Sequence, residues 1–267
     1  MSTAAERPSL GVLKLGEGEQ RFRLTRLAPS AEVGCFVMHY WFVQWDLTDQ
    51  EPYMQEVLPN PCVNAAIEHG RSGIFAPAKE RFEYEVTGKG SVFGVKFKPG
   101  GFYPFIKQPI TTLAAKPLEP SVLFGMEARA LEQTLLSLPS EAEMAAWADA
   151  RLQAVLPEPD ETALLVHEVV EAIKSTPDLS RVDQLSERFG LGVRRLQRLF
   201  EQYVGVSPKW VIMLYRLQNA AESIETRRVN SMLELSAQLG YHDQSHFIRD
   251  FKAVVGRTPE AYARSST

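Results

Sequence analysis

The chain has 267 residues, of which 45% are hydrophobic and 23% charged, a composition that excludes a disordered chain and indicates a folded globular protein. Its formal net charge of −4 is unevenly distributed, because residues 181–267 carry a net charge of +4 and residues 1–180 carry −8. A basic C-terminal part on an acidic body favours nucleic acid as a partner of the C-terminal part alone.

Targeting and redox signals are sparse. Residues 1–10 lack the apolar core of a signal peptide, and no apolar run approaches the ~18 residues that suggest a membrane span. Cys35 and Cys62 form neither a disulfide framework nor a metal-ligand spacing. We therefore expect a cytoplasmic protein with reduced thiols and no membrane contact.

Short alternating apolar segments run from Arg21 to Phe97, separated by turn residues. The expected strands cover residues 21–27, 36–45, 56–58, 63–69, 81–86 and 92–97, with a further short strand possible at Val12–Leu15. The segment Thr87-Gly88-Lys89-Gly90 has the composition of a hairpin turn between the last two strands. Such a series of strands predicts an antiparallel sandwich or barrel.

The strand expected at residues 36–45 is the densest aromatic stretch of the chain. Four of its residues are candidates for the apolar wall of an effector pocket: Tyr40, Trp41, Phe42 and Trp45. The alternative is that alternate residues of this strand simply fill the core, which is the usual role of a single aromatic residue there.

Helical patterns follow the strands. A short helix is expected at Phe102–Ile106, a proline-bearing loop at 107–124, and a helical region from Met126 to Leu156. Pro157 and Pro159 mark a boundary, and Asp160 is placed to cap the next helix. The chain is thus expected to change from one domain to the next near residue 158.

A short unit occurs twice in the C-terminal part, with an offset of 50 residues at its start and 51 at its end. The matched pairs are Leu185 and Leu235, Ser186 and Ser236, Gly190 and Gly240, Phe200 and Phe251, Val204 and Val255, Gly205 and Gly256, and Pro208 and Pro259. Each copy is predicted to be a helix, a glycine turn and a second helix, because glycine accepts the left-handed conformation that ends a helix.

The second helix of each copy has one apolar face, formed by Leu196, Leu199, Phe200 and Tyr203 in the first copy and by Phe247, Phe251 and Val254 in the second. Its exposed face includes Arg194, Arg195, Gln197 and Arg198 in the first copy and Gln244, Ser245 and Arg249 in the second. Arginine can bond guanine O6 and N7 together, and glutamine can bond adenine N6 and N7. A polar helical pair is common without DNA, but two basic copies favour two helix-turn-helix units.

A capped helix follows each copy, at Ser207-Pro208 and at Thr258-Pro259. Lys209 stands next to the first of these caps, at the positive end of a helix, where a DNA phosphate is favoured.

Residues 160–264 resemble the DNA-binding domain of the AraC/XylS family of transcription regulators. The resemblance lies in Gly240-Tyr241-His242-Asp243-Gln244-Ser245-His246-Phe247, Phe251-Lys252 and Gly256-Arg257-Thr258-Pro259-Glu260-Ala261-Tyr262, which are similar to the C-terminal signature of the family. It implies seven helices and two helix-turn-helix units joined by a long central helix, here Pro208–Glu225. The buried side of that helix would hold Trp210, Leu214, Leu217, Ala221 and Ile224.

The same resemblance assigns base-reading positions to Arg194, Gln197 and Arg198 in the first unit and to Gln244, Ser245, His246 and Arg249 in the second. Segments 57–63 and 93–101 resemble parts of an N-terminal domain found in one subgroup of these regulators. In the family generally, the N-terminal domain is similar to a cupin-like β-fold that binds a small effector, with helices that mediate dimerisation.

Together these observations predict an α+β protein, with a β-rich, cupin-like sensor domain at residues 1–124, a helical linker and dimerisation region at 125–157, and a double helix-turn-helix domain at 158–267. The expected function is sequence-specific transcription regulation, controlled by an effector or by dimerisation. Expected partners are double-stranded DNA, a small-molecule effector, RNA polymerase and a second copy of the chain. No cofactor, metal ion or catalytic residue is expected.

Two alternatives remain. His39, His69, Cys35, Cys62 and Glu68 are metal-binding residue types, although no spacing forces any two of them together. A metal-dependent cupin-type enzyme domain fused to a DNA-binding domain is therefore one alternative. The other is a regulator whose N-terminal domain binds only protein partners.

Overall fold

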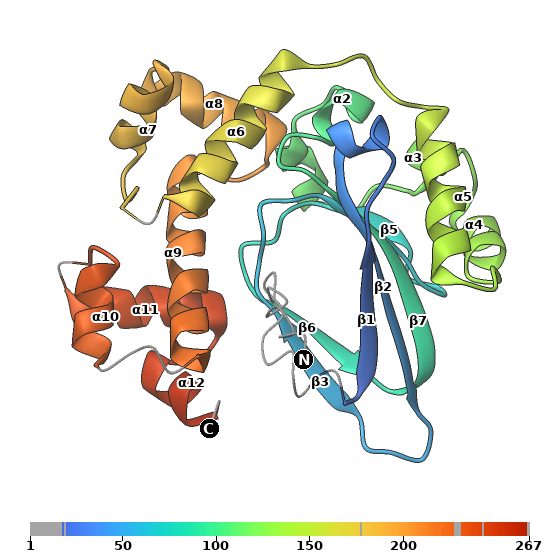
Figure 1. Ribbon diagram of the computed structural model, residues 1–267, viewed down its shortest axis with the longest axis horizontal. Helices are drawn as coiled ribbons and strands as arrows, with labels where there is room; N and C mark the ends of the chain where they lie inside the picture. The colour runs from blue at the N-terminus through green and yellow to red at the C-terminus, as the bar shows by residue number, and fades with distance from the viewer. Residues whose placement is uncertain (1–17, 19, 177, 227–230, 242, 266–267) are drawn as a thin grey trace, which may run out of the picture.

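Antiparallel strands build the N-terminal part of the computed structural model, which describes residues 18, 20–176, 178–226, 231–241 and 243–265 (Figure 1). The strands are β1 (Phe22–Leu27), β2 (Val37–Leu47), β3 (Tyr53–Val57), β4 (Asn64–Ile67), β5 (Gly73–Phe75), β6 (Phe82–Val86) and β7 (Gly88–Phe97). They form a five-stranded sheet in the order β1-β2-β7-β4-β5 and a two-stranded sheet of β3 and β6. The strand expected at Val12–Leu15 lies outside the described residues, and β5 was not expected.

Alternation along β2 divides the aromatic stretch between two cores. Tyr40 and Phe42 are buried on one face of the large sheet, against the helices that follow it in the chain. Trp41 and Trp45 point to the opposite face and pack with residues of β3 and β6. Period-two alternation of this kind is the ordinary geometry of a strand that is covered on both sides.

The hairpin expected at Thr87-Gly88-Lys89-Gly90 is wrong. Strand β6 pairs with β3, whereas β7 begins at Gly88 and pairs with β2 and β4, so the chain passes here from one sheet to the other. The glycines have a different use from a hairpin turn, because the indole of Trp45 lies against Gly90 in the space that a Cβ atom would fill. Only Thr87 separates β6 from β7, and the pairing of each strand depends on distant segments.

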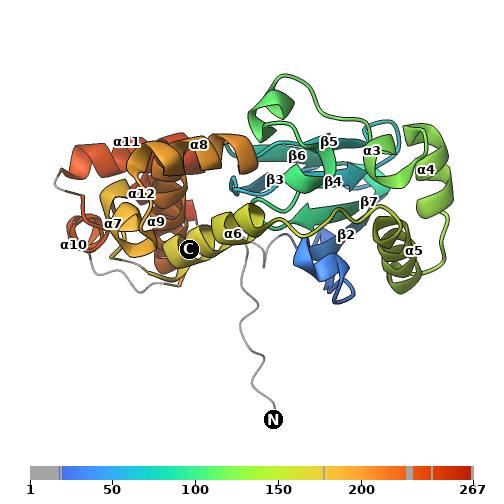
Figure 2. The same ribbon diagram turned by 90° about the horizontal axis from the view of Figure 1, so that it is seen from above.

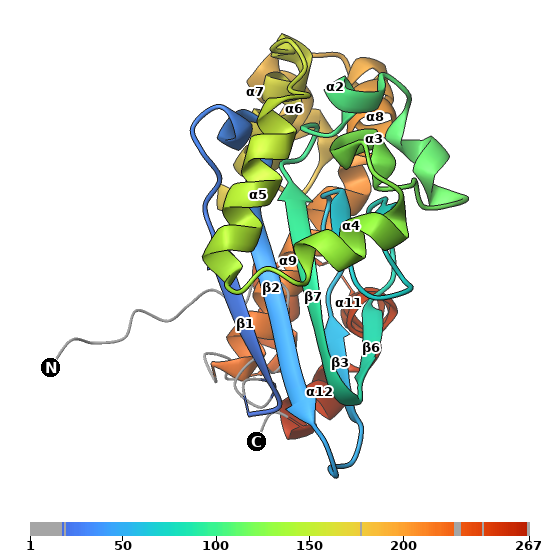
Figure 3. The ribbon, with the colours of Figure 1, turned by 90° about the vertical axis from the view of Figure 1, so that its right-hand side faces the viewer.

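Short helices cover one face and one end of the large sheet. They are α2 (Tyr103–Ile106), the 3-10 helix η2 (Ile110–Ala114), α3 (Ser121–Phe124), α4 (Ala128–Leu135) and α5 (Glu141–Gln153), with a further 3-10 turn η1 (Val33–Cys35) before β2. Figure 3 shows α4 and α5 in front of β1, β2 and β7. The loop expected at 107–124 therefore contains two short helical segments. The predicted helical region at 126–156 is two helices, because Ser140 caps α5 by accepting a hydrogen bond from the amide of Glu143 at 3.2 Å.

The C-terminal part consists of seven helices within the described residues, as the family resemblance implies. They are α6 (Glu161–Ser175), α7 (Val182–Phe189), α8 (Val193–Tyr203), α9 (Pro208–Glu225), α10 (Met232–Gln238), α11 (Gln244–Val255) and α12 (Pro259–Ser265). Asp160 caps α6 by accepting from the amides of Thr162 and Ala163 at 2.8 and 3.1 Å. The β sheets followed by this helical part confirm the predicted α+β class.

Helix α9 connects two separate apolar cores. Its first half packs with α6, α7 and α8, around residues such as Leu196 and Phe200. Its second half packs with α10, α11 and α12, around Phe247 and Phe251. Of the residues expected on the buried side of α9, Leu214, Leu217, Ala221 and Ile224 are buried and Trp210 is partly buried.

The β-rich part contacts both helical units, the first around α7 and α8 and the second around α10 and α11. At the first unit, the rings of Tyr103 and Tyr203 lie 4.1 Å apart, and Gln202 Nε2 donates to the Tyr103 hydroxyl at 2.6 Å. At the second unit, Leu58 is buried in the core formed by α9 to α12. None of the helices in the described residues is both long enough and apolar enough to cross a membrane.

A group of ion pairs completes the second contact. Glu56 on β3 accepts from Arg257 Nη2 at 3.0 and 3.2 Å, and it also pairs with Arg81. Arg81 Nη1 lies 3.4 Å from the carbonyl oxygen of Val255, at the end of α11. Sequence reasoning did not find this cluster, because Glu56 and Arg257 are 201 residues apart in the chain.

Candidate nucleic-acid interface

The first helix-turn-helix unit consists of α7 and α8. Helix α7 ends at Gly190, whose φ of 63° lies in the left-handed region, where glycine carries no penalty from a Cβ atom. The Ser186 hydroxyl donates to the Leu191 carbonyl at 2.6 Å and so holds the turn. Leu196, Phe200 and Tyr203 of α8 are buried, which fixes the opposite face of α8 toward solvent.

That solvent face of α8 carries the predicted base-reading side chains. Arg194, Arg195, Gln197 and Arg198 are all exposed, and within the described residues none of them forms a side-chain hydrogen bond or ion pair. Three guanidinium groups and one amide are therefore available to a ligand with hydrogen-bond acceptors. The edges of bases in the major groove and the DNA phosphates offer such acceptors.

The second unit consists of α10 and α11, with Asp243 as the N-cap of α11, accepting from the amide of Ser245 at 3.0 Å. Phe247, Phe251 and Val254 are buried as predicted, and Ser245 and Arg249 are exposed, whereas Gln244 is half-buried. His242, which belongs to the predicted signature, lies outside the described residues.

His246 is not as free as the arginines of α8. Its Nε2 lies 3.2 Å from a carboxylate oxygen of Asp250, one turn along α11, and the Tyr241 hydroxyl donates to the same oxygen at 3.2 Å. The reading face of α11 is therefore less basic than that of α8. We expect the first unit to contribute more to DNA affinity, because phosphate neutralisation dominates that affinity.

Lys209 occupies the first turn of α9, where Ser207 is the N-cap and accepts from the amide of Trp210 at 3.2 Å. The lysine is exposed. Its ammonium therefore stands beside the positive end of the helix dipole, a place that favours an anion.

The second helices of the two units, α8 and α11, are the recognition helices, and they have the same orientation relative to the β-rich part. Figures 1 and 2 show α8 and α11 running roughly parallel, at opposite ends of α9. The contacts of Tyr203 with Tyr103 and of Val255 with Arg81 place the C-terminal end of each helix against the β-rich part. The N-terminal turns, which carry Arg194 and Gln244, point away from it. In helix-turn-helix proteins these N-terminal turns contact the base edges.

The predicted effector-binding residues do not line a common cavity in the described structure. Tyr40 and Phe42 belong to one apolar core, and Trp41 and Trp45 to the other. The Tyr40 hydroxyl donates to Asp149 at 2.8 Å, which links β2 to α5. These positions match the core role that was the alternative for this strand, and their part in binding an effector stays a prediction.

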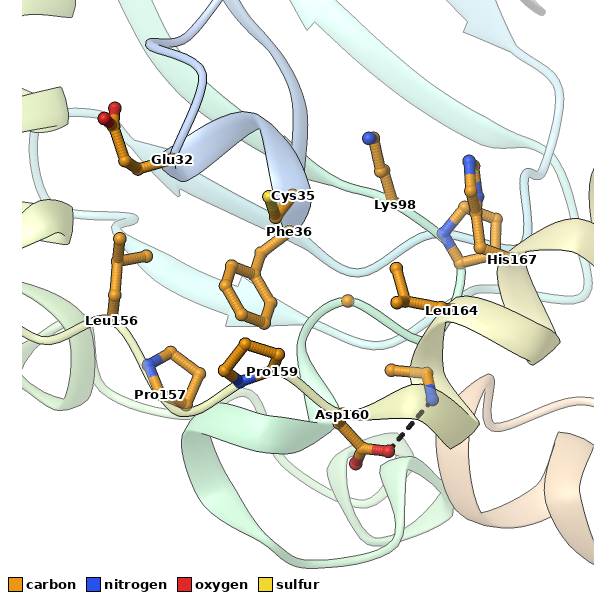
Figure 4. A pocket seen from close by; sticks show the side chains of 13 residues that line it. Glu32, Cys35, Phe36, Lys98, Leu156, Pro157, Pro159, Asp160, Leu164 and His167 are labelled. Atoms are coloured by element: carbon orange, nitrogen blue, oxygen red, sulfur yellow. Dashed lines mark hydrogen bonds between the residues drawn. The ribbon is translucent and has the colours of Figure 1, made fainter.

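Metal binding has no support among the described residues, where no group of three or more His, Cys, Asp or Glu side chains is placed to hold an ion. The structure also contains a cleft that was not predicted from the sequence. It is a cleft of about 290 Å³ between η1, the turn after β7 and the start of α6 (Figure 4). Its walls come from three distant segments, so no local motif could indicate it.

Two family models match the chain. Residues 185–265 match the family described as "Helix-turn-helix domain", and residues 25–119 match "Domain of unknown function (DUF6597)". The C-terminal part is therefore a helix-turn-helix DNA-binding domain. Its two units on one central helix make it a domain of the AraC type, as the sequence signature predicted.

Similar proteins carry regulator names. Over 84 residues the chain is 30% identical to an uncharacterized HTH-type transcriptional regulator of Haemophilus influenzae, covering 32% of this chain and 28% of that protein. Over 81 residues it is 36% identical to the F1 operon positive regulatory protein of Yersinia pestis, covering 30% of this chain and 27% of that protein. The chain thus spans less than a third of the length of either curated relative. The solved structure of ToxT from Vibrio cholerae O395 aligns with a TM-score of 0.39 and 12% identity, over 93% of this chain and 99% of that one.

Proposed function

We propose that the chain is a sequence-specific transcription regulator that binds double-stranded DNA through α8 and α11. The observation that carries this proposal is the pair of recognition helices held on one central helix, with their N-terminal turns free of the β-rich part. Arg194, Arg195, Gln197 and Arg198 read or anchor the DNA in the first unit. Gln244, Ser245, His246 and Arg249 do so in the second.

The division of labour follows the order of the chain. Residues 1–124 sense an effector, 125–157 provide the helical linker and dimerisation surface, and 158–267 bind DNA. The regulator acts in the cytoplasm without catalytic activity of its own, and it communicates with RNA polymerase. The chain exchanges between an arrangement that binds DNA and one that does not. An effector or a second copy of the chain shifts the population toward the first arrangement by binding it more tightly than the second.

A footprint tests whether both units bind together. The 18 residues of α9 span roughly 27 Å at a rise of about 1.5 Å per residue, which is close to the ~34 Å of one DNA turn. We expect hydroxyl-radical footprinting of a single bound protomer to show two protected major-groove segments about 10 base pairs apart. Protection of one segment alone would contradict simultaneous insertion of α8 and α11.

A pair of substitutions separates base reading from anchoring. Arg198→Ala is expected to weaken binding by about 1–3 kcal/mol and to relax the preference at one base position, because a bidentate contact to guanine is lost. Lys209→Ala is expected to weaken binding to all sequences alike and to reduce the salt slope by about one unit, because one phosphate contact is lost.

The measurement is binding to a library of site variants at several salt concentrations, with Glu201→Ala as a control for the fold of α8. Glu201 is exposed on the same helix and has the sign of charge that DNA repels. A uniform loss for Arg198→Ala, with unchanged sequence preference, would show that Arg198 holds a phosphate.

A further inference from the structure

The two recognition helices have matching positions along their whole length. Helix α8 begins at Val193 and α11 begins at Gln244, 51 residues later. The turns that follow the two helices match at the same offset, because Gly205 and Gly256 both have a positive φ, of 87° and 84°. Each residue of α8 therefore has a counterpart on α11, the residue 51 positions further along the chain.

Burial shows that the counterparts also point to the same side of their helices. Phe200 of α8 and Phe251 of α11 are counterparts, and both are completely buried. Arg198 and Arg249 lie two residues before these phenylalanines, and both are exposed. When both helices enter the major groove, as proposed above, the two arginines meet base pairs at equivalent places.

The roughly parallel course of α8 and α11 determines the direction in which the DNA is read (Figures 1 and 2). Two parallel recognition helices read the same strand in the same direction, whereas a two-fold symmetric dimer reads inverted half-sites. One protomer therefore meets two half-sites in direct repeat, roughly 10 base pairs apart. Arginine on both helices favours guanine at the same position of each half-site.

The residues that precede these arginines differ between the two units. Gln197 is exposed on α8, and its counterpart on α11 is Ile248. Ile248 is half-buried, because part of its side chain packs on the core of the second unit and the rest is accessible. Glutamine can bond N6 and N7 of adenine, whereas an apolar side chain in the major groove contacts the methyl group of thymine. The two units thus offer different chemistry at one shared position.

The second unit also has fewer positive charges in the first turn of its recognition helix. Arg194 and Arg195 of α8 have Ser245 and His246 as counterparts on α11. The His246 ring lies 3.2 Å from the carboxylate of Asp250, which offsets any charge that the ring carries. Phosphate contacts hold the DNA without reading its sequence, so a unit with fewer cations depends more on contacts to the bases.

We propose that Ile248 is a base-reading residue that contacts the methyl group of a thymine in the second half-site. The first half-site has adenine at the corresponding position, where Gln197 binds it. Both half-sites have guanine at the neighbouring position, where Arg198 and Arg249 bind. The role of Ile248 rests on the proposed function, because it requires that α11 enters the major groove.

The test begins with the selection of binding sites from random DNA duplexes by the full chain. We expect two half-sites in direct repeat, both with guanine, and with thymine beside the guanine of the second half-site. Deoxyuridine in place of that thymine removes only the methyl group. It is expected to weaken binding about fourfold, because the burial of one methyl-sized apolar group is lost.

Exchange of the two counterparts should exchange the preferred bases. Ile248→Gln is expected to change the preference in the second half-site from thymine to adenine, by about fivefold or more, and to remove the effect of deoxyuridine. Gln197→Ile makes the reciprocal change at an exposed position and is expected to introduce thymine in the first half-site. Ala253→Gln places glutamine at an exposed position in the last turn of α11, near the β-rich part, and should leave every base preference unchanged.

Thermal unfolding of each variant shows whether it is folded. If Ile248→Gln does not fold, deoxyuridine and Gln197→Ile decide. The proposal is overturned if deoxyuridine at the thymines of the second half-site leaves binding unchanged, or if neither exchange changes the preferred base of its half-site. Selection of no specific sequence at all would instead contradict the proposed function, so the two failures are distinct.

Discussion

Phe200→Ala and Phe251→Ala are each expected to lower the free energy of unfolding of the C-terminal helices by about 3–5 kcal/mol. Both side chains are completely buried. Each substitution removes a whole ring from the core and leaves a cavity, because the surrounding helices cannot close on it fully. The two sites lie in separate cores, one at each end of α9. Their effects should therefore add when both residues are replaced.

The packing around the second ring explains the size of the expected loss. Phe251 packs edge-on against Phe247 at 5.7 Å and against Tyr262 at 5.8 Å, between ring centroids. Edge-to-face pairs of this kind contribute beyond the area they bury. Removal of one ring therefore disturbs α11 and α12 together.

Denaturant unfolding followed by circular dichroism measures these changes, with DNA binding measured on the same samples. Leu233→Ala is the matched control, because Leu233 belongs to α10 but is 65% exposed, and its loss should change the free energy of unfolding by no more than about 0.5 kcal/mol. A normal unfolding midpoint for Phe200→Ala or Phe251→Ala would mean that the ring in question does not support its core.

The second large effect is expected from Glu56→Gln, which should destabilise the docking of the second unit by about 2–4 kcal/mol. The Glu56 side chain is only 12% exposed and faces the guanidinium groups of Arg81 and Arg257. Without the carboxylate, the guanidinium groups of Arg81 and Arg257 lose the partner that they share, while Arg81 retains its ion pair with Glu83. The loss is smaller than for a fully buried pair, because the Arg257 side chain is 38% exposed and water screens it.

A double-mutant cycle measures this coupling. Glu56→Gln, Arg257→Gln and the double variant are compared by denaturation and by hydrogen exchange of the α11 amides. We expect the double variant to lose less free energy of unfolding than the sum of the losses of the two single variants. Glu85→Gln, an exposed change on the neighbouring strand β6, is the control. Additive losses would mean that the two residues do not act on each other.

Local sequence signals, together with the resemblance to a known family, were sufficient for the helical part. The resemblance implied a central helix at Pro208–Glu225, and the structure has the same bounds. The start of this helix is also encoded locally, by the adjacent cap Ser207-Pro208. The buried stripes of α8 and α11 followed from spacing alone, and the family signature added the arrangement of two units on one helix. The roles of individual side chains in reading bases stay predictions.

Long-range contacts were beyond the reach of those signals. The glycines near residue 88 suggested a hairpin turn, but they lie within β7, and whether β7 would pair with β6 or with β2 depended on residues some 40 positions away. The Glu56 cluster and the cleft at the start of α6 arise in the same way, from segments that meet only in the folded chain. Sequence reasoning placed an effector pocket at Tyr40–Trp45 because aromatic density is a local signal, whereas a cleft between domains has none.

Leu58 has a practical consequence for work on the isolated DNA-binding part. Its side chain is 4% exposed and belongs to the same apolar core as Leu214, Leu217 and Phe251, although it comes from the β-rich part. A fragment that begins near residue 158 lacks this leucine and exposes the aliphatic surface that it covers. Such a fragment should aggregate more readily on expression than the whole chain, and a polar residue at the uncovered site is the remedy that the structure indicates.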